Sequence, residues 1–460
     1  MSQGTSQDIA TFRDPAGSLR IKDEHVLRTV NPHYAAEALR FLQSDLARRW
    51  TDEGHLIASQ VLSAEKDQPL LLQHPRVFFP SYPWEWTPGQ WVAAAELTLE
   101  LCSRLLHEGW ILKDATPLNI LFDGARPVFV DLLSIERRDP GSPLWLAYGQ
   151  FARTFLLPLA AYKYLGWPLA ATLNRRDGYE PVDLYPYLSS RERWGAPLRS
   201  LVTLPNLLQT RKRGTGAPPK LQQEPQIAAA VLQRNLRAFG RTLHALKPTG
   251  RDSRWSQYQA DAGHYSGQDR QQKQEFVSRA MHLLRPDSVL DIGGNTGHYS
   301  RIAAGVGARV VAWDTDVASC DRSWREAKAA GLPILPLVAD VARPTPATGW
   351  CNTESLTLLE RARDRFDCVM MLGILHHLLL ADQIPIADVA GLLASLTRRS
   401  SIVEWVPRTD VRYIDLCRGR DELYGHLDED LFVKQFTRYF TIAAREELAN
   451  GRVLFLFEKT

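Results

Sequence analysis

Three aspartates and a pair of histidines follow successive apolar runs in the C-terminal half of the chain. Asp291, Asp314 and Asp340 each end such a run, and His376-His377 come shortly after a fourth. A carboxylate accepts hydrogen bonds from hydroxyl and amino groups, and a neutral histidine can accept a proton. Because the carboxyl ends of parallel strands meet at one edge of a sheet, where ligands bind, we expect these side chains to share one site.

A glycine-rich turn follows the first of these runs, with the sequence Asp291-Ile-Gly-Gly-Asn-Thr-Gly297. Glycines suit a turn in which a ligand lies against backbone, where a Cβ would collide, at the start of a helix. A glycine turn followed by an acidic strand end also suits a dinucleotide such as NAD, but the spacing is not GxGxxG. A dinucleotide also gives no reason for Asp340 or for the histidine pair.

The elements that must position these residues alternate between strand and helix from Ser288 onward. The pattern predicts an α/β domain with a mostly parallel sheet flanked by helices. The expected strands are 289–291, 309–313, 334–339, 368–372 and 401–406, followed by strand-like runs at 440–444 and 452–457. Expected helices include 269–284, 386–396 and 428–440.

The ordered set of strand ends resembles the class I, Rossmann-like methyltransferases that use S-adenosylmethionine. The resemblance covers about residues 255–460 and implies that the glycine turn surrounds the methionine part of the cofactor. It implies that Asp314 binds the ribose, and that Asp340 with Val341 binds the adenine. The implied cofactor-binding residues are Asp291, Gly293, Gly294, Asn295, Gly297, Asp314, Asp340 and Val341, with Asn295 in place of the middle glycine of the usual pattern.

The histidine pair supplies the candidate catalytic groups. A hydroxyl acceptor needs a general base, and His376 and His377 are the nearest candidates in the sequence. Both could instead be packing residues at a helix start. Glu404, at the end of the fifth strand, is expected to be structural or to shape the substrate site. No metal is expected in this domain.

A second group with chemical potential lies in the N-terminal half. Asp114 and Asn119 stand five apart, and a short hairpin brings Asp131 back towards them. These residue types orient a hydroxyl nucleophile and hold magnesium on phosphates. Two strands at 17–21 and 25–30, a helix at 35–50, strands at 56–62 and 70–73, and a helix at 90–107 are expected to carry them.

This arrangement resembles the protein-kinase-like fold, especially its aminoglycoside-phosphotransferase branch, over about residues 15–200. The resemblance implies an α+β domain with an ATP and magnesium site at Asp114, Asn119 and Asp131. The chain departs from that pattern because it lacks a glycine-rich phosphate loop and carries Arg28 where a phosphate-pairing lysine is expected. Leu132-Leu133 also stands where Phe-Gly usually follows the aspartate. These departures favour a domain that recruits substrate over one that transfers phosphate.

The sequence therefore predicts a kinase-like domain at 1–205, a linker and connecting helix at 206–254, and a methyltransferase domain at 255–460. Within the linker region, 210–220 is basic and rich in glycine and proline, and 225–246 has helical periodicity. The tandem layout resembles bacterial nodulation-type methyltransferases. The resemblance leaves the methyl acceptor open, whether a small molecule, a glycan or a peptide. The alternatives are a bifunctional methyltransferase and phosphotransferase, or a cofactor-binding scaffold without turnover.

The composition of the chain bears on its binding partners and on its cellular compartment. A net charge of +3 over 460 residues gives no indication of nucleic-acid binding. No apolar run reaches the roughly 18 residues that span a bilayer, and the polar N-terminus has no signal-peptide layout. The five cysteines show no CxxC or zinc-ligand spacing, which predicts a reducing cytoplasm and neither disulfides nor a zinc site.

Overall fold

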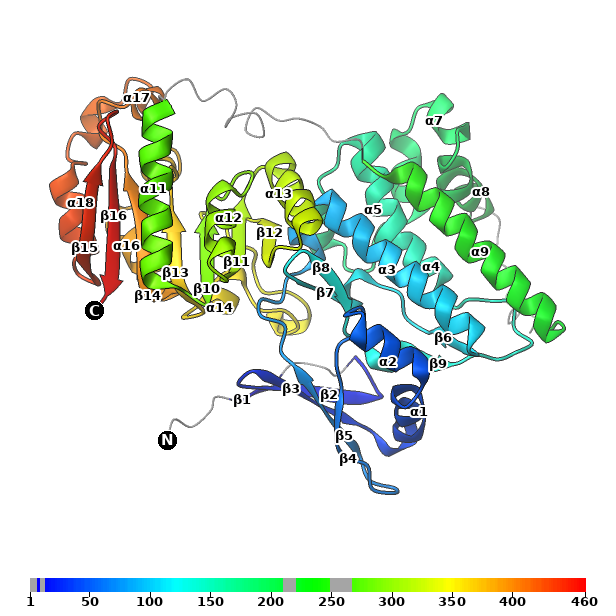
Figure 1. Ribbon diagram of the computed structural model, residues 1–460. Coiled ribbons are helices and arrows are strands. Elements are labelled where there is room, and N and C mark those ends of the chain that lie inside the picture. Colours follow the sequence, from blue (N-terminus) through cyan, green and yellow to red (C-terminus); the bar gives the residue numbers. More distant parts are fainter. Residues whose placement is uncertain (1–5, 9–12, 210–220, 249–266) are drawn as a thin grey trace. The chain divides into compact units, whose positions relative to one another are not determined.

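A computed structural model describes residues 6–8, 13–209, 221–248 and 267–460 (Figure 1). The chain divides into two compact units. Unit 1 comprises 1–123, 127–249 and 348–354, and unit 2 comprises 124–126, 250–347 and 355–460. The basic segment 210–220 and the predicted domain boundary at 254/255 lie outside the described residues.

Unit 1 begins with a five-stranded antiparallel sheet in the order β1-β2-β3-β5-β4. The predicted N-terminal hairpin is confirmed, since β2 and β3 pair from Gly17 opposite Val30 to Lys22 opposite His25. The strands of this sheet are β1 (Ser6–Asp8), β2 (Gly17–Lys22), β3 (His25–Val30), β4 (Gln60–Ser63) and β5 (Leu70–Pro75). The strands predicted at 56–62 and 70–73 correspond to β4 and β5, but β4 begins only at Gln60, and Leu56 pairs with Phe129 instead.

The single helix predicted for 35–50 is wrong. Two helices occupy the region, α1 (Pro32–Leu42) and α2 (Asp45–Asp52). Between them Ser44 has an extended backbone, and its side chain accepts a hydrogen bond from the backbone N–H of Ala47 at 3.2 Å. A serine that caps a new helix in this way competes with continuation of the old one.

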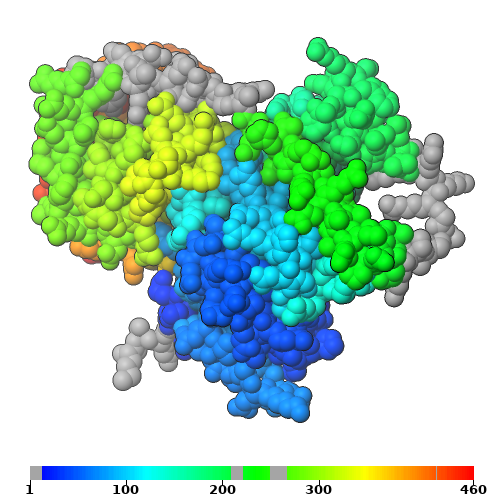
Figure 2. All heavy atoms as spheres, turned by 45° about the vertical axis from the view of Figure 1, so that its right-hand side comes forward, coloured from blue at the N-terminus to red at the C-terminus, as the bar shows by residue number. Residues whose placement is uncertain are grey.

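The core of unit 1 forms around α3 (Pro88–His107), which confirms the predicted helix at 90–107. Thr87 caps it by accepting from the backbone N–H of Gln90, while the Gln90 side chain accepts from the Thr87 N–H. The predicted helix at 225–246 is confirmed as α9 (Pro225–Leu246), which packs against α3 and runs along the surface of unit 1, in green in Figure 2.

Short strands and helices complete unit 1. The strands pair as β6 (Trp110–Leu112) with β9 (Ile135–Arg137) and β7 (Ile120–Asp123) with β8 (Arg126–Phe129). The α-helices are α4 (Tyr148–Phe151), α5 (Leu157–Ala160), α6 (Pro181–Leu184), α7 (Ser190–Trp194) and α8 (Leu204–Gln209). The 3-10 segments are Pro83–Glu85, Pro117–Asn119, Leu132–Ser134, Leu169–Asn174, Tyr185–Tyr187 and Trp350–Asn352, and the π-helical segments are Ala152–Leu156, Ala161–Leu165 and Arg199–Thr203.

Unit 2 is built on a seven-stranded mixed sheet in the order β12-β11-β10-β13-β14-β16-β15. The first five strands along the chain are parallel, and the last two pair antiparallel. These strands are β10 (Ser288–Ile292), β11 (Arg309–Asp314), β12 (Ile334–Val338), β13 (Phe366–Met371), β14 (Thr397–Trp405), β15 (Phe440–Glu447) and β16 (Val453–Lys459). All seven predicted strands are present. Those buried on both faces, such as β10 and β13, read as nearly continuous apolar runs.

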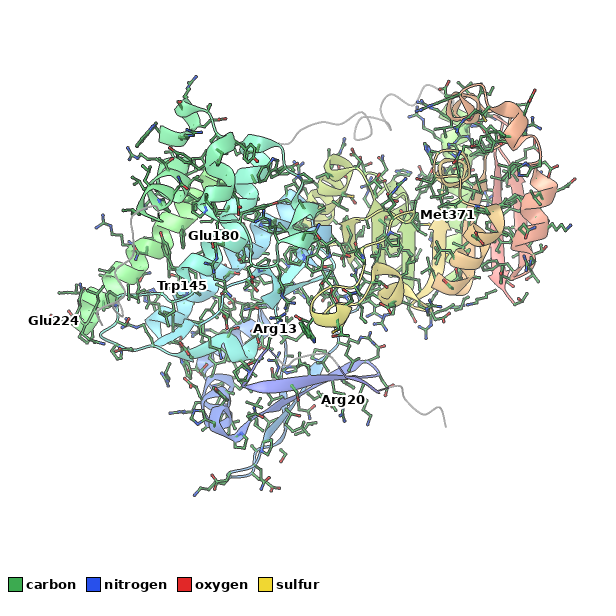
Figure 3. All side chains as sticks on the ribbon, turned by 180° about the vertical axis from the view of Figure 1, so that it is seen from behind. Arg13, Arg20, Trp145, Glu180, Glu224 and Met371 are labelled. Carbon is green, nitrogen blue, oxygen red and sulfur yellow. The ribbon has the colours of Figure 1, made fainter. Side chains whose placement is uncertain are left out.

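The order in which the strands follow one another along the sheet reverses between β10 and β13. Both strands end there at paired residues, Ile292 opposite Met371, which is labelled in Figure 3. In a parallel sheet the loops that leave two such strands run to opposite faces and open a crevice between them. This crevice is where the predicted site residues were expected to meet.

The helices of unit 2 follow the predicted pattern, and α11 packs against β16 and α12. They are α11 (Gly267–Leu284), α12 (His298–Gly305), α13 (Val317–Ala330), α14 (Leu358–Ala362), α15 (Leu375–Leu380), α16 (Ile386–Leu396), α17 (Val411–Cys417) and α18 (Glu429–Phe436), with a 3-10 turn at Asp421–Tyr424. In the part of the chain that the structure describes, no helix combines the length and apolarity needed to cross a bilayer.

Candidate active site

A cavity of about 650 Å³ opens in unit 2 at the carboxyl ends of β10, β11, β12 and β13. The structure brings most of the predicted residues into its wall. Those that line it are Gly293, Gly294, Asn295, Asp314, Asp340, Val341 and His377. Three predicted residues do not line it, namely Asp291, Gly297 and His376.

The glycine turn is held by the neighbouring strand. The backbone N–H groups of Gly293 and Gly294 donate to the carbonyl oxygen of Trp313 on β11, at 2.8 and 3.1 Å. Gly297 has a φ of +79° at the start of α12, and a Cβ there would lie 2.4 Å from the Ser323 hydroxyl oxygen. Glycine at 297 is therefore required by the backbone and by packing against α13, a reason that differs from the close ligand contact expected from the sequence.

Asp291 is buried beneath the turn. It is 2% exposed, and its carboxylate accepts a hydrogen bond from the Ser300 hydroxyl on α12 at 2.6 Å. Burial, assisted by the neighbouring Asp314, raises the pKa of Asp291 to about 6, although the Ser300 hydrogen bond opposes the rise. Asp291 thus fixes the start of α12 against the end of β10.

The Asp291 carboxyl should make the stability of unit 2 depend on pH. Its pKa is raised on folding, so its contribution is fully present below the unfolded value near 4 and is lost as the pH rises through about 6. The loss amounts to at most about 3 kcal/mol, at 1.36 kcal/mol per pKa unit. We expect Asp291→Asn to flatten the melting temperature of unit 2 between pH 4 and 6. Identical pH profiles for the two proteins would contradict the assignment.

Asp314 ends β11 and faces the cavity. Its carboxylate accepts from the backbone N–H of Asn295 and of Asp316, both at 2.8 Å, so it also joins the glycine turn to the start of α13. Burial raises the pKa of Asp314, and these backbone hydrogen bonds oppose the rise. A carboxylate held in this way presents its remaining acceptor positions in a fixed direction.

Asp340 and Val341 follow β12 at another part of the wall. One oxygen of Asp340 accepts from the backbone N–H of Ala342 at 2.8 Å and of Arg343 at 3.3 Å. The other accepts from the Arg343 guanidinium at 3.0 Å. A fixed carboxylate therefore stands beside the apolar side chain of Val341, which is 8% exposed.

The two histidines of α15 face different surroundings. His377 lines the cavity, and burial followed by the nearby Arg412 lowers its pKa. His376 is 3% exposed and lies outside the wall, and burial lowers its pKa to about 3. Both rings are therefore neutral near pH 7. Of these two histidines, only His377 is placed to exchange a proton with a group in the cavity.

Sequence reasoning missed a buried charged network at the cavity. Glu404 on β14 is 0% exposed and forms ion pairs with Lys273 at 2.7 Å and Arg452 at 3.5 Å. Arg452 also binds the carboxylate of Asp410 at 2.8 and 3.1 Å. Lys273 and Arg452 both line the cavity. Four charges from α11, β14 and the segments beside α17 and β16 thus meet at one wall.

One signal in the sequence could have revealed Lys273. It stands three and four positions before Phe276 and Val277, which places it on the buried stripe of α11. A lysine on an apolar stripe needs a buried anion nearby. No comparable signal marks Arg452, whose partners come from other elements.

The structure also brings the three N-terminal residues into one cluster in unit 1. The Asn119 side-chain amide donates to the Asp114 carbonyl oxygen at 3.3 Å and to the Ser134 hydroxyl at 3.1 Å, and that hydroxyl donates to Asp131. Gln150 on α4 donates to the Asp114 carboxylate at 3.4 Å.

Arg28 completes this cluster from β3. It is 6% exposed, and its guanidinium donates to the Asp131 carboxylate at 3.3 Å and to the Val130 carbonyl oxygen at 3.0 Å. The positive charge beside the Asp131 carboxylate therefore comes from the Arg28 side chain. Within the described ranges, no group of three or more His, Cys, Asp or Glu side chains is arranged to hold a metal ion.

Comparison with known proteins finds one relative that spans almost the whole chain. Nodulation protein NoeA of Rhizobium meliloti (strain 1021) is 27% identical over 465 residues, covering 98% of this chain and 95% of the relative. This relative is a nodulation protein, as the sequence resemblance predicted. No family model matches the chain.

Solved methyltransferase structures resemble only part of the chain. Magnesium protoporphyrin IX methyltransferase from Synechocystis PCC 6803 with bound S-adenosylhomocysteine is 18% identical, has a TM-score of 0.31, and is matched over 42% of this chain and 84% of its own. N-methyltransferase NodS from Bradyrhizobium japonicum WM9 in complex with S-adenosylhomocysteine is 13% identical, with a TM-score of 0.31 and coverage of 44% and 98%. Both TM-scores lie below 0.5, and each match covers less than half of this chain.

Proposed function

We propose that the chain is a methyltransferase that takes a methyl group from S-adenosylmethionine and passes it to an acceptor bound in unit 2. One observation carries this proposal. The glycine turn after β10, Asp314 at the end of β11 and Asp340–Val341 after β12 line one cavity, at the place where the order of the strands along the sheet reverses. The strands that carry them lie in the order 3-2-1 along the sheet, followed by the fourth and fifth, which is the order of a Rossmann-like fold.

The residues of the cavity fit an adenosyl cofactor. Asp314 offers a fixed carboxylate that accepts from both hydroxyls of a ribose. Asp340 offers a carboxylate to the exocyclic amine of the purine, and Val341 and Leu378 offer apolar surface to its ring. The cavity volume of about 650 Å³ lies within the range of small-molecule sites.

The proposed methyl transfer requires little acid–base catalysis by the protein. Bound S-adenosylmethionine supplies an activated methyl group. The chain must then hold the acceptor atom in line with that group and exclude competing water. His377 is a neutral ring in the cavity wall and accepts the proton of a hydroxyl or amine acceptor. His376 packs behind it and supports the ring.

Unit 1 is proposed to be a kinase-like domain that recruits or positions the acceptor. Its antiparallel sheet with α1 and α2 between β3 and β4, followed by a loop that gathers Asp114, Asn119 and Asp131, supports that fold. The same cluster favours phosphate transfer as a second activity. Arg28 argues against it, because its guanidinium already neutralises the carboxylate that would hold magnesium.

Magnesium and ATP should therefore leave the melting of unit 1 unchanged. The Arg28–Asp131 ion pair must open before the aspartate can bind a metal, and Arg28 repels the cation. Thermal unfolding with millimolar ATP, with and without magnesium, measures this. A magnesium-dependent shift that disappears in Asp131→Ala would instead support the bifunctional enzyme.

Calorimetric titration with S-adenosylhomocysteine tests the proposed methyltransferase cavity. We expect one binding site per chain, and weaker or undetectable binding of NAD in the same experiment. Tight NAD binding without S-adenosylhomocysteine binding would overturn the proposal in favour of a dinucleotide enzyme.

The five cysteines of the chain are free, four of them buried, which fits the proposed cytoplasmic setting.

A further inference from the structure

Two carboxylates from separate elements meet one arginine at the purine end of the cavity. Asp340 follows β12, Asp382 follows α15, and both line the cavity together with Arg343. The Arg343 guanidinium donates to Asp340 at 3.0 Å through one nitrogen and to Asp382 at 2.7 Å through another. It thereby joins two parts of the cavity wall, since Arg343 and Asp382 are 39 residues apart in the chain.

We propose that Arg343 is a positioning residue for the adenosine part of the cofactor, acting by tying Asp340 to Asp382 across this end of the cavity. The inference rests on the proposed methyltransferase function and adds a residue that determines how firmly the cofactor is held. The planar guanidinium reaches two carboxylates at once, which the single ammonium of a lysine does not reproduce.

The bridge has two consequences for the cavity. Every hydrogen bond that the structure gives Asp340, two from backbone N–H groups and one from Arg343, turns its carboxylate in one direction before any ligand arrives. Preorganisation of this kind raises affinity because less freedom is lost on binding. At the other end, the backbone N–H of Asp382 donates to the His377 carbonyl oxygen at 3.1 Å, so the bridge also holds the end of the helix that carries His377.

The bridge is poorly explained as a device for stability. The Arg343 side chain is 72% exposed, and exposed ion pairs contribute little to folding. Asp340 and Asp382 would repel each other at the cavity edge without a cation between them. The position of the arginine is therefore better explained by the geometry of the site than by folding.

The test compares two ligands in the full-length protein. S-adenosylhomocysteine carries both the adenosine and the amino-acid part, whereas 5'-methylthioadenosine carries only the adenosine part. We expect Arg343→Ala to weaken binding of both by a similar factor of about 5- to 20-fold, mainly through faster dissociation. Asp382→Asn should also weaken binding of both ligands. Arg343→Lys should weaken it nearly as much as Arg343→Ala does.

Arg322→Ala is the matched control, because Arg322 is an exposed arginine of unit 2 paired with Glu326 on α13, outside the cavity wall. It should bind both ligands as the wild type does, and no variant should shift the melting temperature of the free protein. Wild-type binding by Arg343→Ala, or a loss confined to S-adenosylhomocysteine, would overturn the inference while leaving the proposed function intact. Failure of the wild type itself to bind S-adenosylhomocysteine would overturn both.

Discussion

Asp314→Ala should weaken binding of S-adenosylhomocysteine by about 10- to 100-fold, because charge-assisted hydrogen bonds worth about 1.5–3 kcal/mol are lost. The carboxylate stands at the end of β11 in the cavity wall, where a ribose is expected. It also accepts from the backbone N–H groups of Asn295 and Asp316, so its removal loosens the glycine turn as well. Calorimetric titration measures the change.

Asp388→Ala is a suitable control for this experiment. Asp388 is an exposed aspartate in the first turn of α16 and does not line the cavity. We expect its replacement to leave the affinity unchanged. If Asp314→Ala also bound S-adenosylhomocysteine with unchanged affinity, Asp314 would not be the ribose-binding residue.

Glu404→Ala should lower the free energy of unfolding of unit 2 by about 3–5 kcal/mol, the usual effect of removing one partner of a buried ion pair. The substitution leaves Lys273 and Arg452 buried without the carboxylate that lies between them. Asp410 still neutralises Arg452, so the larger part of the loss should come from Lys273. Calorimetry of the full-length chain measures it, with the transition of unit 2 assigned as the one that S-adenosylhomocysteine raises.

An exposed ion pair in unit 2 provides the matched control for Glu404→Ala. Arg279 on α11 forms an ion pair with Glu446 on β15, and their side chains are 60% and 33% exposed. Glu446→Ala should therefore cost less than about 1 kcal/mol. Equal effects of Glu404→Ala and Glu446→Ala would show that the network at the cavity is not desolvated.

The strands of unit 2 and the residues at their ends could be predicted because both signals are local. A parallel strand buried on both faces is a short apolar run, and the polar residue that ends it is adjacent in sequence. Asp314 and Asp340 are predicted in this way, and both line the cavity. Asp291 follows the same rule but is buried under the turn, where its carboxylate accepts a hydrogen bond from the Ser300 hydroxyl on the next helix.

The features that the sequence did not predict depend on contacts between distant residues or on the direction of a side chain. Lys273 and Glu404 are 131 positions apart, and nothing in either local pattern names the other. Consecutive residues on a helix point about 100° apart. The pattern could therefore not say that His377 faces the cavity while His376 is buried behind it. Likewise, the break between α1 and α2 depends on one serine side chain turning back to its own backbone.

In unit 1 the sequence predicted which residues come together, but not the ion pair that neutralises one of them. Asp114, Asn119 and Asp131 do gather in one place. Arg28 could be seen in the sequence as a substitution for an expected lysine. Its ion pair with Asp131 could not, because it joins residues 103 positions apart.

Transfer of a labelled methyl group tests the central claim most directly. The purified full-length protein is incubated with S-adenosylmethionine deuterated in its methyl group and with a metabolite extract of the organism that makes it, and labelled products are identified by mass spectrometry. We predict a labelled product that forms with the wild type and is absent with Asp314→Ala at the same cofactor concentration. A wild-type protein that binds S-adenosylmethionine but forms no labelled product above the Asp314→Ala background would contradict the claim and leave a cofactor-binding scaffold.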